Sequence, residues 1–248
     1  MEADPYHFLV REPAPLRGSV TQAVTASLRE AIVTLTLKPG EVLDKSAICA
    51  RLGVSRFPVS EALARLQTEG LVEILPQRSS TVSRVKMAEV LEYMLIRKAL
   101  EGEAVRVLTL FQQPALMERI RQNLQQQRAA VGNGDRDGFH ELDLLFHDLL
   151  SESMGLARLK TIIEGARSNL DRARRLLITP RRHAVSLAEH EAITSSLEQG
   201  DAAGAVKAMR AHIDLVVREL LEFAREQPAL FADGDAFRDK DLPAFPFG

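Results

Sequence analysis

Four side chains in the second half of the sequence have types and positions that suit a metal ion. Asp143 and His147 are four residues apart in a segment of helical periodicity, so they project from one face of a helix. His190 and His212 stand among apolar residues in two later segments. Burying a carboxylate and three imidazoles is costly unless each is paired or coordinated. A divalent ion would satisfy all four, and these donors suit zinc first, with nickel or manganese as alternatives.

A hydrogen-bonded core is the other explanation for the same four residues. An Asp–His pair at this spacing is commonly a core pair, and a lone core histidine is usually satisfied by one partner. Spacing alone therefore leaves both explanations open. The remaining histidines, His7, His140 and His183, lack such placement, and we expect them at the surface.

The candidate metal ligands lie in a region of long helical periods that begins at Met87. Breaks divide this region into successive helices at Pro114, Gly132–Gly134, Gly155, Thr179-Pro180 and Gly200. Ser186 with Glu189 forms a capping-box pattern that predicts a helix start at Ser186, and Asp201 is expected to cap the last helix. Residues 87–228 are therefore predicted to form an all-α antiparallel bundle of six or seven helices.

A second group of candidate functional residues lies in the stretch Gly53–Val72. Ser55 stands at the N-cap position of a predicted helix, and Gly70 follows its end as a residue that readily adopts positive φ. Arg56, Phe57 and Ser60 fall at the N-terminal end of this helix and away from its apolar stripe. A helix that presents such an end suits a polar, anionic partner.

The neighbouring segments give this helix a recognisable setting. Helices are predicted from Ser19 to before Pro39 and over Lys45–Leu52, and two short strands around a polar turn follow. Three helices and a β-ribbon in residues 18–86 form a winged helix-turn-helix, whose third helix would enter the major groove of double-stranded DNA. The expected DNA-contact residues are Lys45, Ser55, Arg56, Phe57, Ser60 and, at the wing tip, Arg78. A winged helix used only for protein contacts is the alternative.

Composition is compatible with this division into a mostly α protein with two domains. Residues 17–86 hold 10 Lys and Arg against 6 Asp and Glu, whereas residues 87–248 hold 21 against 25. A basic front end on an acidic body is expected if only the front touches phosphate. One cysteine, Cys49, and the lack of a membrane-length apolar run favour a cytoplasmic protein without a membrane partner. Residues 1–17 and 229–248 are expected to be flexible tails.

The motifs resemble a known bacterial family. The N-terminal segment resembles the winged helix-turn-helix of GntR-family transcription regulators, and the bundle resembles the FCD ligand-binding domain of the FadR subfamily. The N-terminal match consists of Pro39-Gly40-Glu41-x-Leu43, Gly53-Val54-Ser55-Arg56-x-Pro58-Val59-x-Glu61-Ala62-Leu63 and Leu66-x-x-Glu69-Gly70-Leu71-Val72. Asp143, His147, His190 and His212 match the metal-ligand pattern of FCD domains, and Arg97 matches an arginine that helps to hold a carboxylate effector.

The resemblance implies a function for the chain as a whole. It implies a ligand-responsive regulator, not an enzyme, that binds a palindromic operator as a homodimer and is released by a small organic acid, as a repressor would be. This sequence has Phe57 where the family usually has Thr, and Ser60 where it usually has a DNA-contacting Arg. These differences put the usual operator sequence in doubt.

Two rival functions remain open on the sequence. One is a metal-dependent enzyme with an appended winged helix, although neither Glu189 nor Glu191, which flank His190, is clearly aimed at the site as a general base. The other is a metal sensor, in which the ion itself is the signal.

Overall fold

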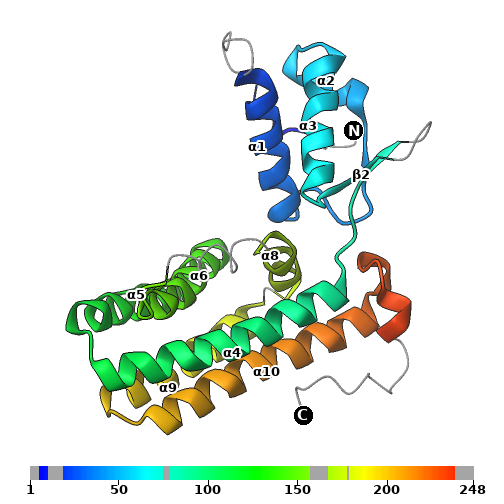
Figure 1. The fold of residues 1–248 in the computed structure, drawn as a ribbon. Helices are drawn as coiled ribbons and strands as arrows, with labels where there is room; N and C mark the ends of the chain where they lie inside the picture. The colour runs from blue at the N-terminus through cyan, green and yellow to red at the C-terminus, as the bar shows by residue number, and fades with distance from the viewer. Residues whose placement is uncertain (1–5, 11–18, 75–78, 157–166, 178, 238–248) are drawn as a thin grey trace. The chain divides into compact units, whose positions relative to one another are not determined.

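The chain folds into two compact units in a computed structural model, which describes residues 6–10, 19–74, 79–156, 167–177 and 179–237 (Figure 1). One unit comprises Met1–Lys86 and Gln227–Gly234, and the other comprises Met87–Glu226 and Asp235–Gly248. We refer to them as the N-terminal unit and the helical unit.

The N-terminal unit is a winged helix-turn-helix, as predicted. Its elements are α1 (Ser19–Val33), β1 (Val42–Leu43), α2 (Lys45–Leu52), α3 (Arg56–Thr68), β2 (Val72–Ile74) and β3 (Ser80–Val82). The strands form an antiparallel sheet in the order β1-β3-β2. Sequence patterns predicted only two of these strands, because two residues of β1 are too few to show the alternation that marks a strand.

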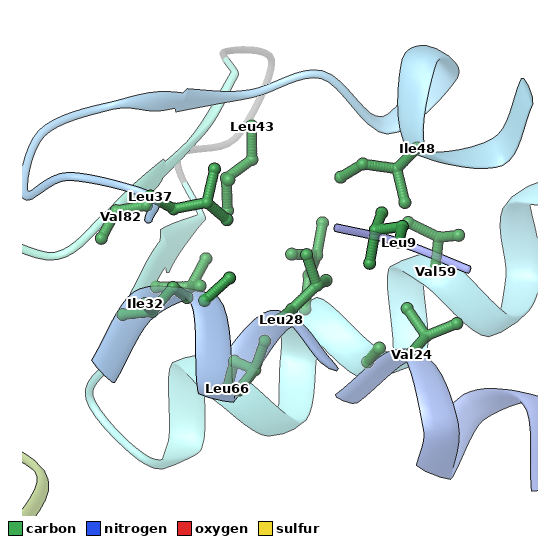
Figure 2. Packing of buried hydrophobic residues seen from close by; sticks show 14 of the residues in the cluster. Leu9, Val24, Leu28, Ile32, Leu37, Leu43, Ile48, Val59, Leu66 and Val82 are labelled. Carbon is green, nitrogen blue, oxygen red and sulfur yellow. The ribbon is translucent and has the colours of Figure 1, made fainter. Parts of the chain in front are cut away.

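A single apolar core holds α1, α2 and α3 to the sheet. Figure 2 shows Leu28 and Ile32 of α1, Leu66 of α3 and Val82 of β3 within this cluster, and all four are at most 1% exposed. The α3 residues in the core follow helical spacing, so the opposite face of α3 remains at the surface.

The turn between α2 and α3 sets the position of the third helix. Asp44 caps α2 by accepting hydrogen bonds from the N–H groups of Ser46 and Ala47. Gly53 ends α2 with φ 65°, a conformation that glycine adopts without steric cost. Ser55 is the N-cap residue of α3, as predicted, but its side chain makes no capping hydrogen bond.

Described residues near both ends of the sequence pack in the N-terminal unit. Tyr6 and Leu9 are buried in its core, and the Tyr6 hydroxyl accepts a hydrogen bond from the Asp44 N–H at 2.8 Å. Phe231 is 2% exposed and forms a parallel bridge with Val85. The expectation of flexible tails therefore does not describe these segments, because isolated apolar residues without periodicity give no sequence signal of packing.

The helical unit is the predicted antiparallel bundle. Its described helices are α4 (Met87–Phe111), α5 (Pro114–Asn133), α6 (Arg136–Glu152), α8 (Arg167–Leu176), α9 (Pro180–Glu198) and α10 (Ala202–Glu226). Helices α4 and α10 lie side by side along their length, and α5 pairs with α6 (Figure 1). Asp201 precedes α10 and accepts a hydrogen bond from the Gly204 N–H at 2.9 Å, as its predicted capping role requires.

The predicted start of α9 at Ser186 is wrong. The helix begins six residues earlier, where Thr179 caps it by accepting from the Arg182 N–H and Pro180 occupies its first turn. Proline lacks the N–H that a first-turn residue would leave unpaired, so Thr179-Pro180 starts a helix as well as ending one. The predicted helix over residues 156–178 lies partly outside the described residues, so the choice between six and seven helices stays open.

Candidate functional site

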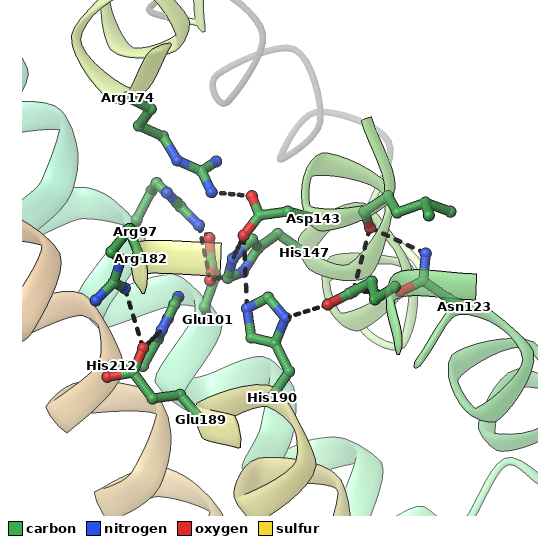
Figure 3. Close-up of polar contacts among 12 residues, drawn as sticks. Arg97, Glu101, Asn123, Asp143, His147, Arg174, Arg182, Glu189, His190 and His212 are labelled. Atoms are coloured by element: carbon green, nitrogen blue, oxygen red, sulfur yellow. Dashed lines mark hydrogen bonds and ion pairs between the residues drawn. The ribbon is translucent and has the colours of Figure 1, made fainter. Parts of the chain in front are cut away.

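Three predicted metal ligands come together in the interior of the helical unit. His147 of α6, His190 of α9 and His212 of α10 each offer a ring nitrogen, and these atoms all lie within 4.8 Å of one another (Figure 3). All three side chains are at most 5% exposed, and the His190 ring stacks on Phe146. His190 thus lies close to His147, 43 positions before it in the chain, and to His212, 22 positions after it.

His147 is oriented by a buried ion pair on α4. Its Nδ1 lies 2.7 Å from Oε2 of Glu101, whose Oε1 accepts a hydrogen bond from Arg97 Nε at 2.6 Å. Burial raises the pKa of Glu101, but the Arg97 guanidinium and the His147 ring outweigh it and hold the pKa well below its usual range. Glu101 is therefore an ionised carboxylate, which can only accept hydrogen bonds. The Nδ1 of His147 must carry the proton and donate it to Glu101 in a hydrogen bond.

His190 and His212 have oriented partners of their own. The Nδ1 of His190 lies 2.9 Å from Oε1 of Gln127, whose amide group donates to Asn123 Oδ1, so the oxygen is left to accept from the histidine. The Nδ1 of His212 lies 2.8 Å from Oε2 of Glu189, and that oxygen also accepts from Arg182.

These partners determine which ring nitrogen of each histidine is free to bind a metal ion. Because each Nδ1 faces an acceptor, the proton sits on Nδ1 and the lone pair sits on Nε2. The buried Nε2 atoms of His147 and His190 have no hydrogen-bond partner among the described residues. A hydrogen-bond donor or a metal ion would satisfy them, and an acceptor on the second nitrogen is what metal-ligating histidines usually have. The three residues therefore fit a divalent ion.

Asp143 lies beside two of the histidines. Its Oδ1 is 3.6 Å from His190 Nε2 and 4.0 Å from His147 Nε2, and its Oδ2 accepts a hydrogen bond from Arg174 of α8. Burial, with the positive Arg97 nearby, lowers the pKa of Arg174 to about 9, so Arg174 is still cationic at neutral pH. One carboxylate oxygen thus faces the histidines while the other is held by an arginine.

A cavity of about 40 Å³ adjoins Asp143 on the side of Arg174 and Arg182. Its lining residues are Phe139, His140, Asp143, Arg174, Leu177, Arg182, His183, Ser186 and Val216. The expectation of surface positions is wrong for His140 and His183, which are 4% and 7% exposed. His183 stacks on Phe139, and an aromatic contact of this kind between two helices leaves no periodic signal in the sequence.

Four of the six predicted DNA-contact residues lie at the start of α3. Ser55, Arg56 and Phe57 are exposed, and Ser60 is half-buried, all around the first turns of α3. Lys45 is half-buried at the start of α2. Arg78, predicted at the wing tip, lies outside the described residues.

Comparison with known proteins identifies the family from both halves of the chain. Residues 20–82 match the family described as "Bacterial regulatory proteins, gntR family", and residues 92–215 match the FCD domain. A regulator from Streptomyces ambofaciens, described as an uncharacterized HTH-type transcriptional regulator in an unstable DNA locus, is 36% identical over 83% of this chain and 86% of its own length. This chain belongs to the GntR family of bacterial transcription regulators.

A second relative agrees with this assignment, and a solved structure shares the fold. The HTH-type transcriptional repressor RspR of Escherichia coli K12 is 31% identical over 86% of this chain and 94% of its own. The crystal structure of a putative GntR transcriptional regulator from Rhodococcus sp. RHA1 has the same fold, with a TM-score of 0.68 and 24% identity over 82% of this chain and 98% of that one. The family consists of regulators, so the enzyme alternative is set aside. In the described part of this GntR-family chain, no helix is long and apolar enough to cross a membrane.

Sequence patterns missed the residues that orient the three buried histidines of this GntR-family regulator. Glu101 left a partial signal, since it follows Arg97 by four residues, the spacing at which opposite charges pair on one helix face. Glu189 is directed at the Nδ1 of His212, which fits an orienting partner and not a general base, while Glu191 pairs with Arg128. Gln127 and Arg174 come from other helices, and contacts of such long range cannot be read from periodicity.

Acid should destabilise the metal-free GntR-family protein in the range where histidines titrate. Burial lowers the pKa of His147, His190 and His212, the last two well below 6.5. The unfolded chain therefore binds more protons than the folded chain as pH falls below about 6.5, and each histidine removes up to about 1.4 kcal/mol of stability per pH unit.

Urea unfolding in a chelator at pH 7.5, 6.5 and 5.5 measures this effect. The free energy of unfolding should fall on going to pH 5.5, and the fall should be smaller in a His190→Asn variant. An equal free energy at all three pH values would show that these rings titrate alike in the folded and unfolded protein, and a rise toward pH 5.5 would show that the folded protein holds them protonated.

Proposed function

We propose that this chain is a repressor that binds a palindromic operator as a homodimer and is released by a small organic acid held at a metal ion. The arrangement of His147, His190 and His212 carries the metal part of this proposal, since one ring nitrogen of each buried residue lies within 4.8 Å of the other two. Asp143 would complete the ligand set through Oδ1, and zinc suits such nitrogen and oxygen donors best. A bound ion would act there as a Lewis acid toward an anionic ligand atom.

The arginines near the site support an anionic effector. Arg174 and Arg182 line the cavity beside Asp143, and their guanidinium groups suit a carboxylate. Arg97, the effector residue implied by the family resemblance, is bound to Glu101 and is not among the lining residues, so its proposed contribution is to hold Glu101 against His147. A cavity of about 40 Å³ accommodates part of a small acid such as a carboxylate headgroup.

Operator binding tests the DNA-binding part of the proposal. Duplexes enriched from a random-sequence pool with the wild-type protein would serve as probes, and affinity would be measured by fluorescence anisotropy at fixed salt. Arg56→Ala should weaken binding about 10- to 100-fold, because an exposed arginine at the start of α3 can contact phosphate or a guanine edge. Arg65→Ala is the matched control, with the same charge change on the same helix but in its C-terminal half, where Arg65 pairs with Glu61.

The effector is found by a thermal-shift screen of small mono-, di- and tricarboxylates on the zinc-loaded protein. An acid that raises the melting temperature should weaken operator binding about 5- to 150-fold, the usual range of allosteric coupling. If zinc alone switches operator binding and no acid does, the protein is a metal sensor. Equal affinity of wild type and Arg56→Ala for every duplex would contradict the DNA-binding proposal itself.

A further inference from the structure

The outward face of α3 carries one large apolar side chain with no packing role. Phe57 is 75% exposed, whereas the core residues of α3, Val59, Leu63 and Leu66, are completely buried. A phenylalanine that is mostly exposed to water does not gain the free energy that burying such a side chain would give. The fold itself derives little benefit from an aromatic ring at this position.

The surroundings of Phe57 leave room for a close approach. Ser60 and Ala64 follow it at helical spacing on the same outward face, and both side chains are small. Glu61, the fourth residue of this face, is neutralised by Arg65 at 2.6 Å and accepts a weaker hydrogen bond from Thr21. The face thus presents an exposed ring beside a shallow surface.

The residues next to Phe57 supply groups for a phosphate backbone. The side-chain hydroxyl of Ser55 does not cap α3, and Arg56 is exposed. A polynucleotide that engages these two groups would bring base edges against the ring. Among base edges in the major groove, the 5-methyl group of thymine is the apolar one, and it forms apolar contacts with side chains such as phenylalanine.

We propose that Phe57 reads the 5-methyl group of a thymine in each half of the operator. This inference rests on the proposed DNA binding and adds a specificity that Ser60 cannot supply, since a serine makes no bidentate contact with guanine. Burying the methyl group against the ring favours thymine over any base that lacks the group.

Replacing thymidine by deoxyuridine tests the proposal, because it removes only the methyl group. The probe is the duplex enriched from random DNA by the wild-type protein, with each thymine replaced in turn. One position per half-site should weaken wild-type binding about fourfold, and replacement in both half-sites about 16-fold, as expected from about 0.8 kcal/mol per buried methyl group. Phe57→Ala should bind the thymine and uracil duplexes equally.

A matched control and the contrary outcomes distinguish a failure of the proposed Phe57–thymine contact from a failure of the proposed DNA binding. Val42→Ala removes another exposed apolar side chain of the same unit, on β1, and should keep the wild-type preference for thymine. Operator binding that is sensitive to Arg56→Ala but insensitive to every uracil replacement would overturn the role of Phe57 alone. An equal preference for thymine in wild type and Phe57→Ala would assign the methyl contact to another residue. A duplex pool that yields no enriched sequence would instead count against DNA binding.

Discussion

The wild-type chain is expected to bind one metal ion per chain, and replacing His190 with alanine is expected to abolish this binding. The His190 ring is completely buried, and its Nε2 has no hydrogen-bond partner among the described residues, so its removal leaves two ring nitrogens and Asp143. Elemental analysis of protein purified without a histidine tag, then reloaded with zinc and desalted, gives the stoichiometry. His190→Asn repeats the test with a polar side chain in case the alanine variant does not fold.

His183→Ala is the matched control for this experiment. His183 is also a buried histidine of α9, but it stacks on Phe139 and lies outside the three-histidine cluster. It should retain one ion per chain. If the wild-type protein holds no metal after reloading, the four residues form a hydrogen-bonded core. If both His190 variants retain the ion, the metal site does not include His190.

The difference between local and long-range information explains how much of this protein its sequence predicts. The pairing of Asp143 with His147 follows from their spacing along α6. The bounds of α3 follow from Ser55 before its start and Gly70 after its end. The start of α9 was misplaced because Ser186 and Glu189 also fit a capping box, although Glu189 is instead used by His212. The local pattern assigns Glu189 to a helix cap, but in the folded chain Glu189 contacts His212 of another helix.

The orienting residues could not be predicted for a related reason. Gln127 and Glu101 reach their histidines across 63 and 46 positions of the chain. No periodicity of a single helix reports which of its polar residues faces another helix. The sequence therefore indicates the candidate metal ligands, whereas the groups that fix their protonation can be identified only in the packed bundle.

Replacing Glu101 with glutamine is expected to destabilise the metal-free protein by roughly 3–5 kcal/mol, because it leaves the charge of Arg97 buried without its partner. The side chains of Arg97 and Glu101 are 5% and 2% exposed, so water cannot compensate. The same change should lower zinc affinity about 10- to 100-fold, since Glu101 orients His147. Urea unfolding in a chelator and competition with a zinc indicator measure the two effects separately.

Controls distinguish the two roles of Glu101. Glu103→Gln, on the same helix, breaks an exposed pair with Arg106 and should change stability and zinc affinity little. Replacing both Arg97 and Glu101 by apolar residues, as Arg97→Met with Glu101→Leu, should recover part of the stability but not the zinc affinity. Recovery of zinc affinity in that double variant would show that His147 does not need Glu101.

The four proposed metal ligands and their partners come from every described helix of the bundle. Asp143 and His147 lie on α6, His190 on α9 and His212 on α10, while their partners come from α4, α5, α8 and α9. An ion that binds there binds the folded chain and not the unfolded chain. It would therefore raise the free energy of unfolding by about 2.7 kcal/mol when the free ion is at 100 times its dissociation constant. Cellular proteases degrade the unfolded fraction, so metal supply would also set how many copies of the regulator a cell retains.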